Sequence, residues 1–171
     1  ETHYHYDEEG MLALEVAPDG SQTAYHYWDG RVRKVVQGER EWRFEHNPQG
    51  DLIARRDPLG NETRYGYTTQ GKLCSVVHPD STRTELVWNH LGQLIEEKGV
   101  DGGTSRWRYD ERGRQIVRQD PRGAITRYEW DAADRLSAVH LPGGGVRRYE
   151  YNAYGKVTAQ WDELGRETRF E

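Results

Sequence analysis

The sequence predicts an all-β protein built from tandem β-hairpins, because glycines and aromatic residues recur in it with one shared period. The first glycine series has a spacing of 21 residues, with one aspartate among its members, and a second series follows ten residues behind it. Aromatic pairs two residues apart precede the first series. A fixed period of this size is the signature of a repeat architecture. The first series is Gly50, Gly71, Gly92, Gly113, Asp134 and Gly155, the second is Gly60, Ser81, Gly102, Gly123, Gly144 and Gly165, and Gly10 and Gly20 show the same offset.

Each repeat is predicted to contain two turns, since tetrads that begin with Asp or Asn and end with Gly punctuate it twice. In a type I turn the first side chain caps a backbone N–H, proline presets φ at the second position, and glycine accepts a positive φ at the exit. The Gly-Gly and Gly-Gly-Gly stretches at 102–103 and 143–145 are interpreted as hairpin turns and not as phosphate loops, because no helix follows them. We assign structural roles in the repeat to Tyr6, Asp7, Gly10, Asp57, Pro58, Gly60, Tyr109, Asp110, Gly113, Asp120, Pro121, Gly123, Tyr128, Trp130, Tyr151, Asn152 and Gly155.

The segments between the turns are predicted to be short antiparallel strands. Along 124–130, Thr126, Tyr128 and Trp130 share one face, while Arg127 and Glu129 point the other way. Two strands in each of about eight repeats give roughly sixteen strands, and open sheets of more than about ten strands rarely stay flat. We therefore expect one long curved antiparallel sheet.

The whole chain, residues 1–171, is interpreted as one repeat region with no second domain. Phe170 opens a ninth repeat, and both ends fall inside a repeat, so we expect a fragment of a longer protein. The stretch from Trp28 to Glu41 breaks the period and is interpreted as a seam or an insertion.

Composition excludes several functional classes. A mean hydropathy of -1.06 would suggest disorder, but eleven tyrosines and six tryptophans at regular intervals supply apolar area. The net charge of -5 argues against nucleic acid as a partner. We find no apolar stretch long enough for a membrane helix, no signal-peptide pattern, and a single cysteine, Cys74, that excludes an internal disulfide.

We expect no catalytic residue, no metal ligand and no cofactor. The repeated carboxylates occupy turn positions, which explains them without general acid/base chemistry. His3 and His5 alternate onto one strand face, but no Cys/His spacing resembles a zinc site. The aromatic stripe, with Arg127 or Arg148 beside it, leaves open a carbohydrate-binding or adhesive surface, although core packing accounts for the same pattern.

The turn motifs resemble the YD repeats of Rhs proteins. They are Tyr109-Asp110-Glu111-Arg112-Gly113, Tyr6-Asp7-Glu8-Glu9-Gly10 and Asp120-Pro121-Arg122-Gly123, and recognisable punctuation covers essentially the whole chain. That family includes bacterial Rhs polymorphic toxins, wall-associated repeat proteins, the B and C components of insecticidal toxin complexes, and animal teneurins. Repeats close to 21 residues long and rich in Trp favour a bacterial member.

The resemblance implies a spiral β-cocoon shell that encapsulates a C-terminal toxin, and a structural, non-catalytic role for this segment. It implies a bacterial type VI secretion effector, made in the cytoplasm and then secreted or translocated. Its partners would be the rest of the same polypeptide, the toxin cargo and secretion spike or adaptor proteins, and the fragment could also associate edge to edge with itself. Toxin or self-cleavage activity would lie outside this chain. The alternative is a cell-surface carbohydrate-binding or adhesive YD-repeat module.

Overall fold

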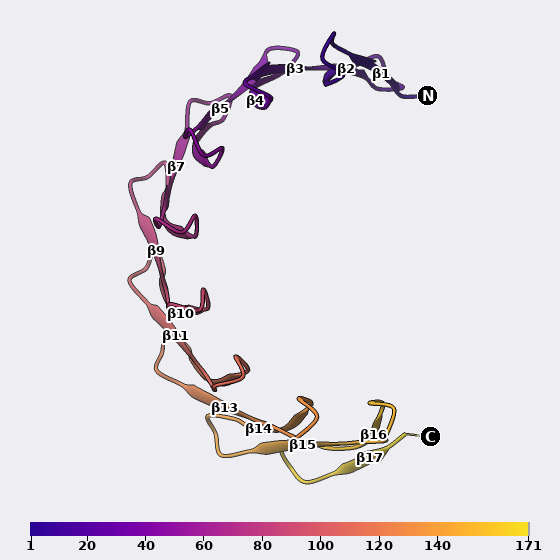
Figure 1. Cartoon of the computed structure of the whole chain (residues 1–171), viewed down its shortest axis with the longest axis vertical. Coiled ribbons are helices and arrows are strands. Elements are labelled where there is room, and N and C mark those ends of the chain that lie inside the picture. Colours follow the sequence, from indigo (N-terminus) through magenta and orange to yellow (C-terminus); the bar gives the residue numbers. More distant parts are fainter. Residues whose placement is uncertain (171) are drawn as a thin grey trace. The chain divides into compact units, whose positions relative to one another are not determined.

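The computed structural model describes residues 1–170 and confirms the all-β prediction (Figure 1). No helix occurs in these residues, and their seventeen strands are antiparallel to the strands they pair with. The strands are β1 (His3–Tyr6), β2 (Leu12–Val16), β3 (Gln22–Trp28), β4 (Arg31–Gln37), β5 (Arg40–His46), β6 (Leu52–Arg56), β7 (Glu62–Tyr67), β8 (Leu73–Val77), β9 (Arg83–Trp88), β10 (Leu94–Lys98), β11 (Thr104–Tyr109), β12 (Gln115–Gln119), β13 (Ile125–Trp130), β14 (Leu136–His140), β15 (Val146–Tyr151), β16 (Val157–Trp161) and β17 (Glu167–Arg169).

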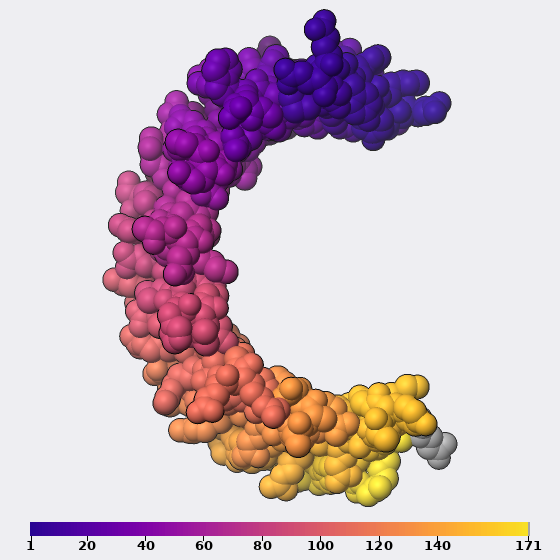
Figure 2. Space-filling view, in the orientation of Figure 1, coloured from indigo at the N-terminus to yellow at the C-terminus, as the bar shows by residue number. Residues whose placement is uncertain are grey.

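The chain divides into two units, residues 1–84 and residues from 85 onward. In the first unit β1 to β8 pair in chain order, each strand with the one before and the one after it. In the second unit β9 pairs with β10, and the same order continues to β17. Each unit is a single layer thick (Figure 2).

Two sets of turns join the strands, and we call them A turns and B turns. A turns follow odd-numbered strands and B turns follow even-numbered strands, so the two sets form opposite rims of each unit, the A rim and the B rim. Both sets close in the same way: Gly113 N donates to Asp110 O over 3.0 Å, and Asp110 N donates to Arg114 O over 2.9 Å. Gly113 has a φ of 83°, which a side chain disfavours. Ser81 and Asp134 adopt the same left-handed conformation at the places where the period lacks glycine.

The two rims differ in the ladders that lead to them. Every hairpin that closes through an A turn contains a register shift near the turn, whereas the B-turn hairpins within β2–β7 and within β10–β17 have none. In the β13–β14 hairpin, Glu129 pairs with Ala138 and Trp130 pairs with Leu136, so one residue of β14 is extra. Such a bulge increases the local twist and aims the neighbouring side chain away from its regular position.

The stretch from Trp28 to Glu41 is not an insertion. It forms the end of β3, the whole of β4 and the start of β5, and these three strands have seven residues each. Asp29 and Gly30 have φ values of 51° and 69°, as a two-residue type I′ hairpin turn requires. The irregular repeat therefore has longer strands joined by a shorter turn.

No part of the described chain has a conventional core. No aromatic side chain in residues 1–170 is fully buried, and the buried side chains there are those of Ala54, Ala138 and Ala159. The accessible surface is 12209 Å² for a mass of 19.9 kDa. A globular monomer of that mass exposes about 8,700 Å². An open sheet leaves both of its faces accessible.

Candidate functional site

The predicted turn residues occupy the positions where each hairpin closes. Asp110 Oδ1 accepts hydrogen bonds from Arg112 N at 3.0 Å and Arg114 N at 2.9 Å. The first residue of most other turns caps in the same way, and the predicted members of this group are Asp7, Asp57, Asp120 and Asn152. Pro58 and Pro121 are the second residues of B turns, while Gly10, Gly60, Gly113, Gly123 and Gly155 have positive φ.

Aromatic side chains at the ends of odd-numbered strands tie each hairpin to the one before it. The Tyr151 hydroxyl donates to the carbonyl of Leu136 over 2.8 Å, and the Trp130 indole N–H donates to the carbonyl of Gln115 over 2.9 Å. The donor lies 15 residues after its acceptor in both cases. Tyr27, Tyr67 and Tyr109 make the same bond to Leu12, Leu52 and Leu94.

These acceptor carbonyls lie where the regular ladder ends. The paired register of β14 and β15 runs from His140 with Val146 to Ala138 with Arg148, and Leu136 lies beyond it, next to the bulge. The phenol of Tyr151 therefore satisfies a carbonyl that the sheet leaves unpaired on that side. Partial burial raises the pKa of the Tyr151 hydroxyl, as it does for Tyr67 and Tyr109.

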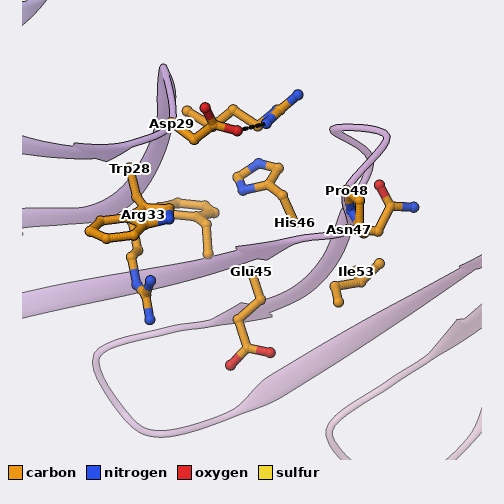
Figure 3. A pocket seen from close by; sticks show the side chains of 10 residues that line it. Trp28, Asp29, Arg33, Glu45, His46, Asn47, Pro48 and Ile53 are labelled. Atoms are coloured by element: carbon orange, nitrogen blue, oxygen red, sulfur yellow. Dashed lines mark hydrogen bonds and ion pairs between the residues drawn. The ribbon is translucent and has the colours of Figure 1, made fainter.

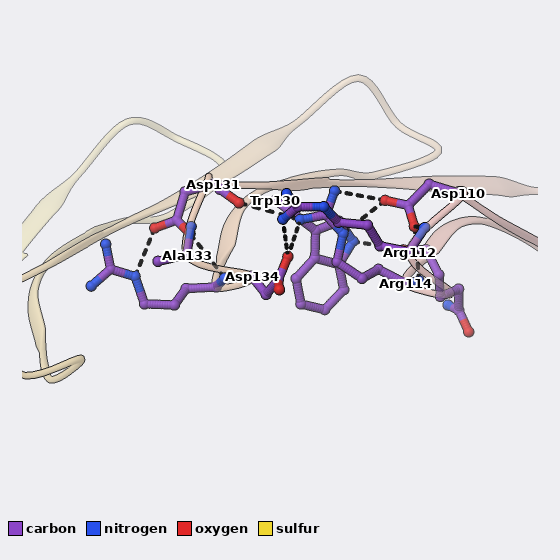
Figure 4. A network of polar contacts seen from close by, with 9 residues as sticks. Asp110, Arg112, Arg114, Trp130, Asp131, Ala133 and Asp134 are labelled. Atoms are coloured by element: carbon purple, nitrogen blue, oxygen red, sulfur yellow. Dashed lines mark hydrogen bonds and ion pairs between the residues drawn. The ribbon is translucent and has the colours of Figure 1, made fainter.

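Arginines on the A rim form a second set of ties (Figure 4). Arg114 bonds Asp110 of its own turn at 2.7 Å, then reaches the next A turn, where it bonds the carbonyl of Asp131 at 3.2 Å and the carboxylate of Asp134 at 2.7 Å. Its guanidinium lies 5.9 Å from the ring centre of Trp130. Each of these arginines thus touches a carboxylate, a backbone carbonyl and an aromatic face.

The same tie is repeated one turn later. Arg135 bonds Asp131 at 2.7 Å and the carbonyl of Asn152 at 2.9 Å, and it lies 4.8 Å from the ring centre of Tyr151. One turn earlier, the Gln93 amide donates to the carbonyl of Gly113 over 3.0 Å. Consecutive A turns from residue 89 to residue 155 are therefore linked side chain to backbone.

These contacts explain the carboxylate pKa values on the A rim. The hydrogen bond from the Arg114 side chain holds the pKa of Asp110 below its ordinary value. The backbone N–H of Arg135, helped by its side chain, does the same for Asp131. Both carboxylates are therefore charged throughout the neutral range, and each serves as a fixed acceptor.

The B rim is held by close packing. A methyl group on Gly103 would lie 2.8 Å from Cβ of Pro121 in the next B turn, and one on Gly145 would lie 2.7 Å from Cβ of Glu163. Neither glycine has a positive φ, so the neighbouring turn and not the backbone conformation requires a small residue. Arg147 bonds Glu163 at 2.8 Å across the same rim.

The three buried alanines lie on the charged face of the sheet. Ala138 pairs with exposed Glu129 on one side and Arg148 on the other, and directly opposed residues share a face. The stems of long charged side chains can cover such a methyl group. The same arrangement recurs as Glu45–Ala54–Arg64 and Glu150–Ala159–Arg169. Tyr128 lies on the opposite face, paired with Val139.

The arginine ties were not predicted from the sequence. Arg114 and Arg135 directly follow the fourth residue of their turns, and they are 21 residues apart, so the period itself carried a signal. What the spacing does not reveal is that these side chains reach the next turn.

Two classes of feature are absent from residues 1–170. No three His, Cys, Asp or Glu side chains there gather in a way that could hold a metal ion. Nor does this part of the chain contain a helix of the length and apolarity needed to cross a membrane.

Comparison with known proteins identifies the fold. Solved structures that match include two crystal structures, of TcdB2-TccC3-Cdc42 and of TcdB2-TccC3 without its hypervariable C-terminal region. Their TM-scores are 0.61 and 0.60 and their identities 14% and 15%, over 94% of this chain and 11% of theirs. A Photorhabdus luminescens Tc holotoxin pore matches with a TM-score of 0.60 and 16% identity, over 99% of this chain and 12% of the other.

The chain thus spans only a small part of the solved chains it matches, and no curated protein matches its sequence. The sequence itself matches the teneurin YD-shell family over residues 1–170. This match confirms the resemblance to Rhs/YD repeats that the turn motifs carry. The chain belongs to the teneurin YD-shell family.

Proposed function

We propose that this chain is a structural, non-catalytic segment of a shell wall that encloses a C-terminal toxin and helps to deliver it. The observation that carries the proposal is the accessible surface of 12209 Å², about 3,500 Å² more than a globular monomer of this mass exposes. A one-layer sheet with no enclosed core serves poorly as a free-standing domain. It serves well as a wall whose faces meet other parts of a larger assembly.

The ties between hairpins support a mechanical role. Side chains on the A rim donate hydrogen bonds to the chain's own backbone carbonyls and carboxylates, as those of Arg114, Arg135 and Tyr151 do. They hold one hairpin to the next at the A rim, where the bulges interrupt the ladder. Because these side chains bond to neighbouring hairpins, we interpret them as groups that strengthen a wall and not as groups that bind a substrate.

We infer the partners and the location of this chain from its family. The partners are the remainder of the same polypeptide and its toxin cargo, with secretion spike or adaptor proteins as further ones. The matched structures are assemblies of Tc components, which supports a larger complex. We infer a bacterial effector that is made in the cytoplasm and then translocated, by type VI secretion.

The proposal is tested on the complete natural polypeptide that contains these residues. We expect electron cryomicroscopy to show a hollow shell, and the segment that follows the repeats to resist added protease. Val139→Pro should expose that segment, because Val139 lies inside β14 and proline cannot donate a ladder hydrogen bond there. Val100→Pro is the matched control, since it places proline at the second position of a B turn, where Pro58 and Pro121 stand.

An extended, open repeat whose following segment is cleaved at once would contradict the shell. Binding of that open repeat to immobilised glycans would instead support the adhesive module.

A further inference from the structure

A pocket lies at the irregular hairpin. The pocket has a volume of about 430 Å³ and lies between the β3–β4 turn and the A turn that follows β5 (Figure 3). Trp28, Arg31, Phe44 and His46 are among the residues that line it. Trp28 is 71% exposed, so much of its indole surface is available to another molecule.

The regular repeats place an aromatic ring at this position. His46 is the last residue of β5, as Tyr151 is the last residue of β15. The Tyr151 ring lies under the Arg135 guanidinium, and its hydroxyl reaches Leu136, the first residue of β14. Fifteen residues before His46 stands Arg31, the first residue of β4. Within residues 1–170 the His46 imidazole makes no hydrogen bond, so this tie is missing.

The irregular repeat also has an arginine beside this position, although Arg31 stands one residue closer to His46 than Arg135 stands to Tyr151. Arg31 bonds Asp29 of its own turn at 3.1 Å, as Arg135 bonds Asp131. Its guanidinium also lies against Gly50 in the next A turn, where a methyl group would be 2.6 Å from Nη2 of Arg31. The Arg31 guanidinium therefore points to the next A turn, as that of Arg114 does. The ring that ends the following odd-numbered strand is here the imidazole of His46, and not an indole or a phenol.

We propose that this pocket binds the phenol of a tyrosine side chain that another polypeptide segment supplies. The ring would lie beside the Arg31 guanidinium and the Trp28 indole, where cation–π and aromatic contacts are both favourable. Arg31 and Arg33 balance Asp29 and Glu45 in formal charge, so the pocket favours a neutral ring over an ion. The chain's own tyrosines show which group fits such a place.

The inference is tested by titrating N-acetyl-tyrosinamide into the full chain and following the Trp28 indole and Arg31 side-chain signals by NMR. We expect saturable shifts confined to the pocket. His46→Tyr should weaken binding at least tenfold and raise the Tm, because the new ring fills the pocket from within. His3→Tyr, at an exposed strand position of the same unit, should change neither.

Three results would overturn the inference. They are a wild-type chain without saturable shifts at Trp28 and Arg31, equal affinity in the folded His46→Tyr variant, and an equal response to N-acetyl-leucinamide. Trp28→Ala provides an independent check, since it removes one wall of the pocket at an exposed position and should also abolish the shifts.

Discussion

The A rim and the B rim hold successive hairpins together by different interactions, which are side-chain hydrogen bonds on the A rim and close packing on the B rim. On the A rim, bulges interrupt the ladder, and side chains such as Arg114 and Tyr151 replace the missing ties with hydrogen bonds. On the B rim the ladder is regular, and successive turns approach so closely that Gly103 and Gly145 have no room for a methyl group. The A rim is therefore sensitive to polar chemistry, and the B rim is sensitive to volume.

The largest expected effect is on the B rim, with Gly103→Ala. Its new Cβ would lie 2.8 Å from a ring carbon of Pro121, and a proline ring cannot rotate away. Overpacking of this kind costs about 1–3 kcal/mol. Urea denaturation of the chain should show this loss in the free energy of unfolding.

Gly143→Ala is the matched control for Gly103→Ala. It lies on the same rim, two B turns further along the chain, it has no positive φ, and no atom lies within 4 Å of the added methyl group. Its stability should stay the same or rise by about 0.4–1 kcal/mol, because alanine restricts the unfolded chain. Equal losses for the two variants would show that close packing does not hold the B rim.

On the A rim, Tyr151→Phe should cost about 0.5–1.5 kcal/mol. The change removes the hydroxyl that bonds the Leu136 carbonyl and keeps the ring under Arg135. Tyr149→Phe, two residues earlier on the same strand, is the control, since no hydrogen bond of the Tyr149 hydroxyl occurs in the described residues. Urea denaturation compares the two variants. An equal loss of unfolding free energy for Tyr149→Phe would show that the hydrogen bonds of the tyrosine hydroxyls do not stabilise the A rim.

A smaller effect is expected for Arg135→Lys. Lysine keeps the charge but loses the planar fork that bonds Asp131 and Asn152 together, and the contact with the Tyr151 ring is worth about 0.5–1 kcal/mol. Arg148→Lys is the control, because Arg148 makes no side-chain hydrogen bond or ion pair in residues 1–170. The Tm should fall only for Arg135→Lys, and indistinguishable melting curves would mean that the arginine ties do not stabilise the A rim.

The sequence predicted the repeat because turns depend on local chemistry. Asp110 caps its own turn and Gly113 exits with positive φ, and both properties are readable from four adjacent residues. The ties could not be predicted in the same way, since Arg114 meets a carbonyl 17 residues away, and that distance depends on the bulge and the twist of two hairpins. The glycines at 103 and 145 were interpreted as turn residues for the same reason, whereas the next turn requires their small size.

The smallest expected effect is on pH dependence, because none of the three tyrosine side chains concerned is fully buried. Burial raises the pKa of Tyr67, Tyr109 and Tyr151, so folding favours their neutral phenols. Stability from this source is complete below the unfolded pKa of about 10 and is lost as pH rises through the folded pKa. The urea midpoint should therefore fall as pH rises above about 10, and less steeply when all three residues are phenylalanine. An unchanged slope in that triple variant would mean that other groups control alkaline stability, and it would separate the hydrogen-bonding role of these hydroxyls from their titration.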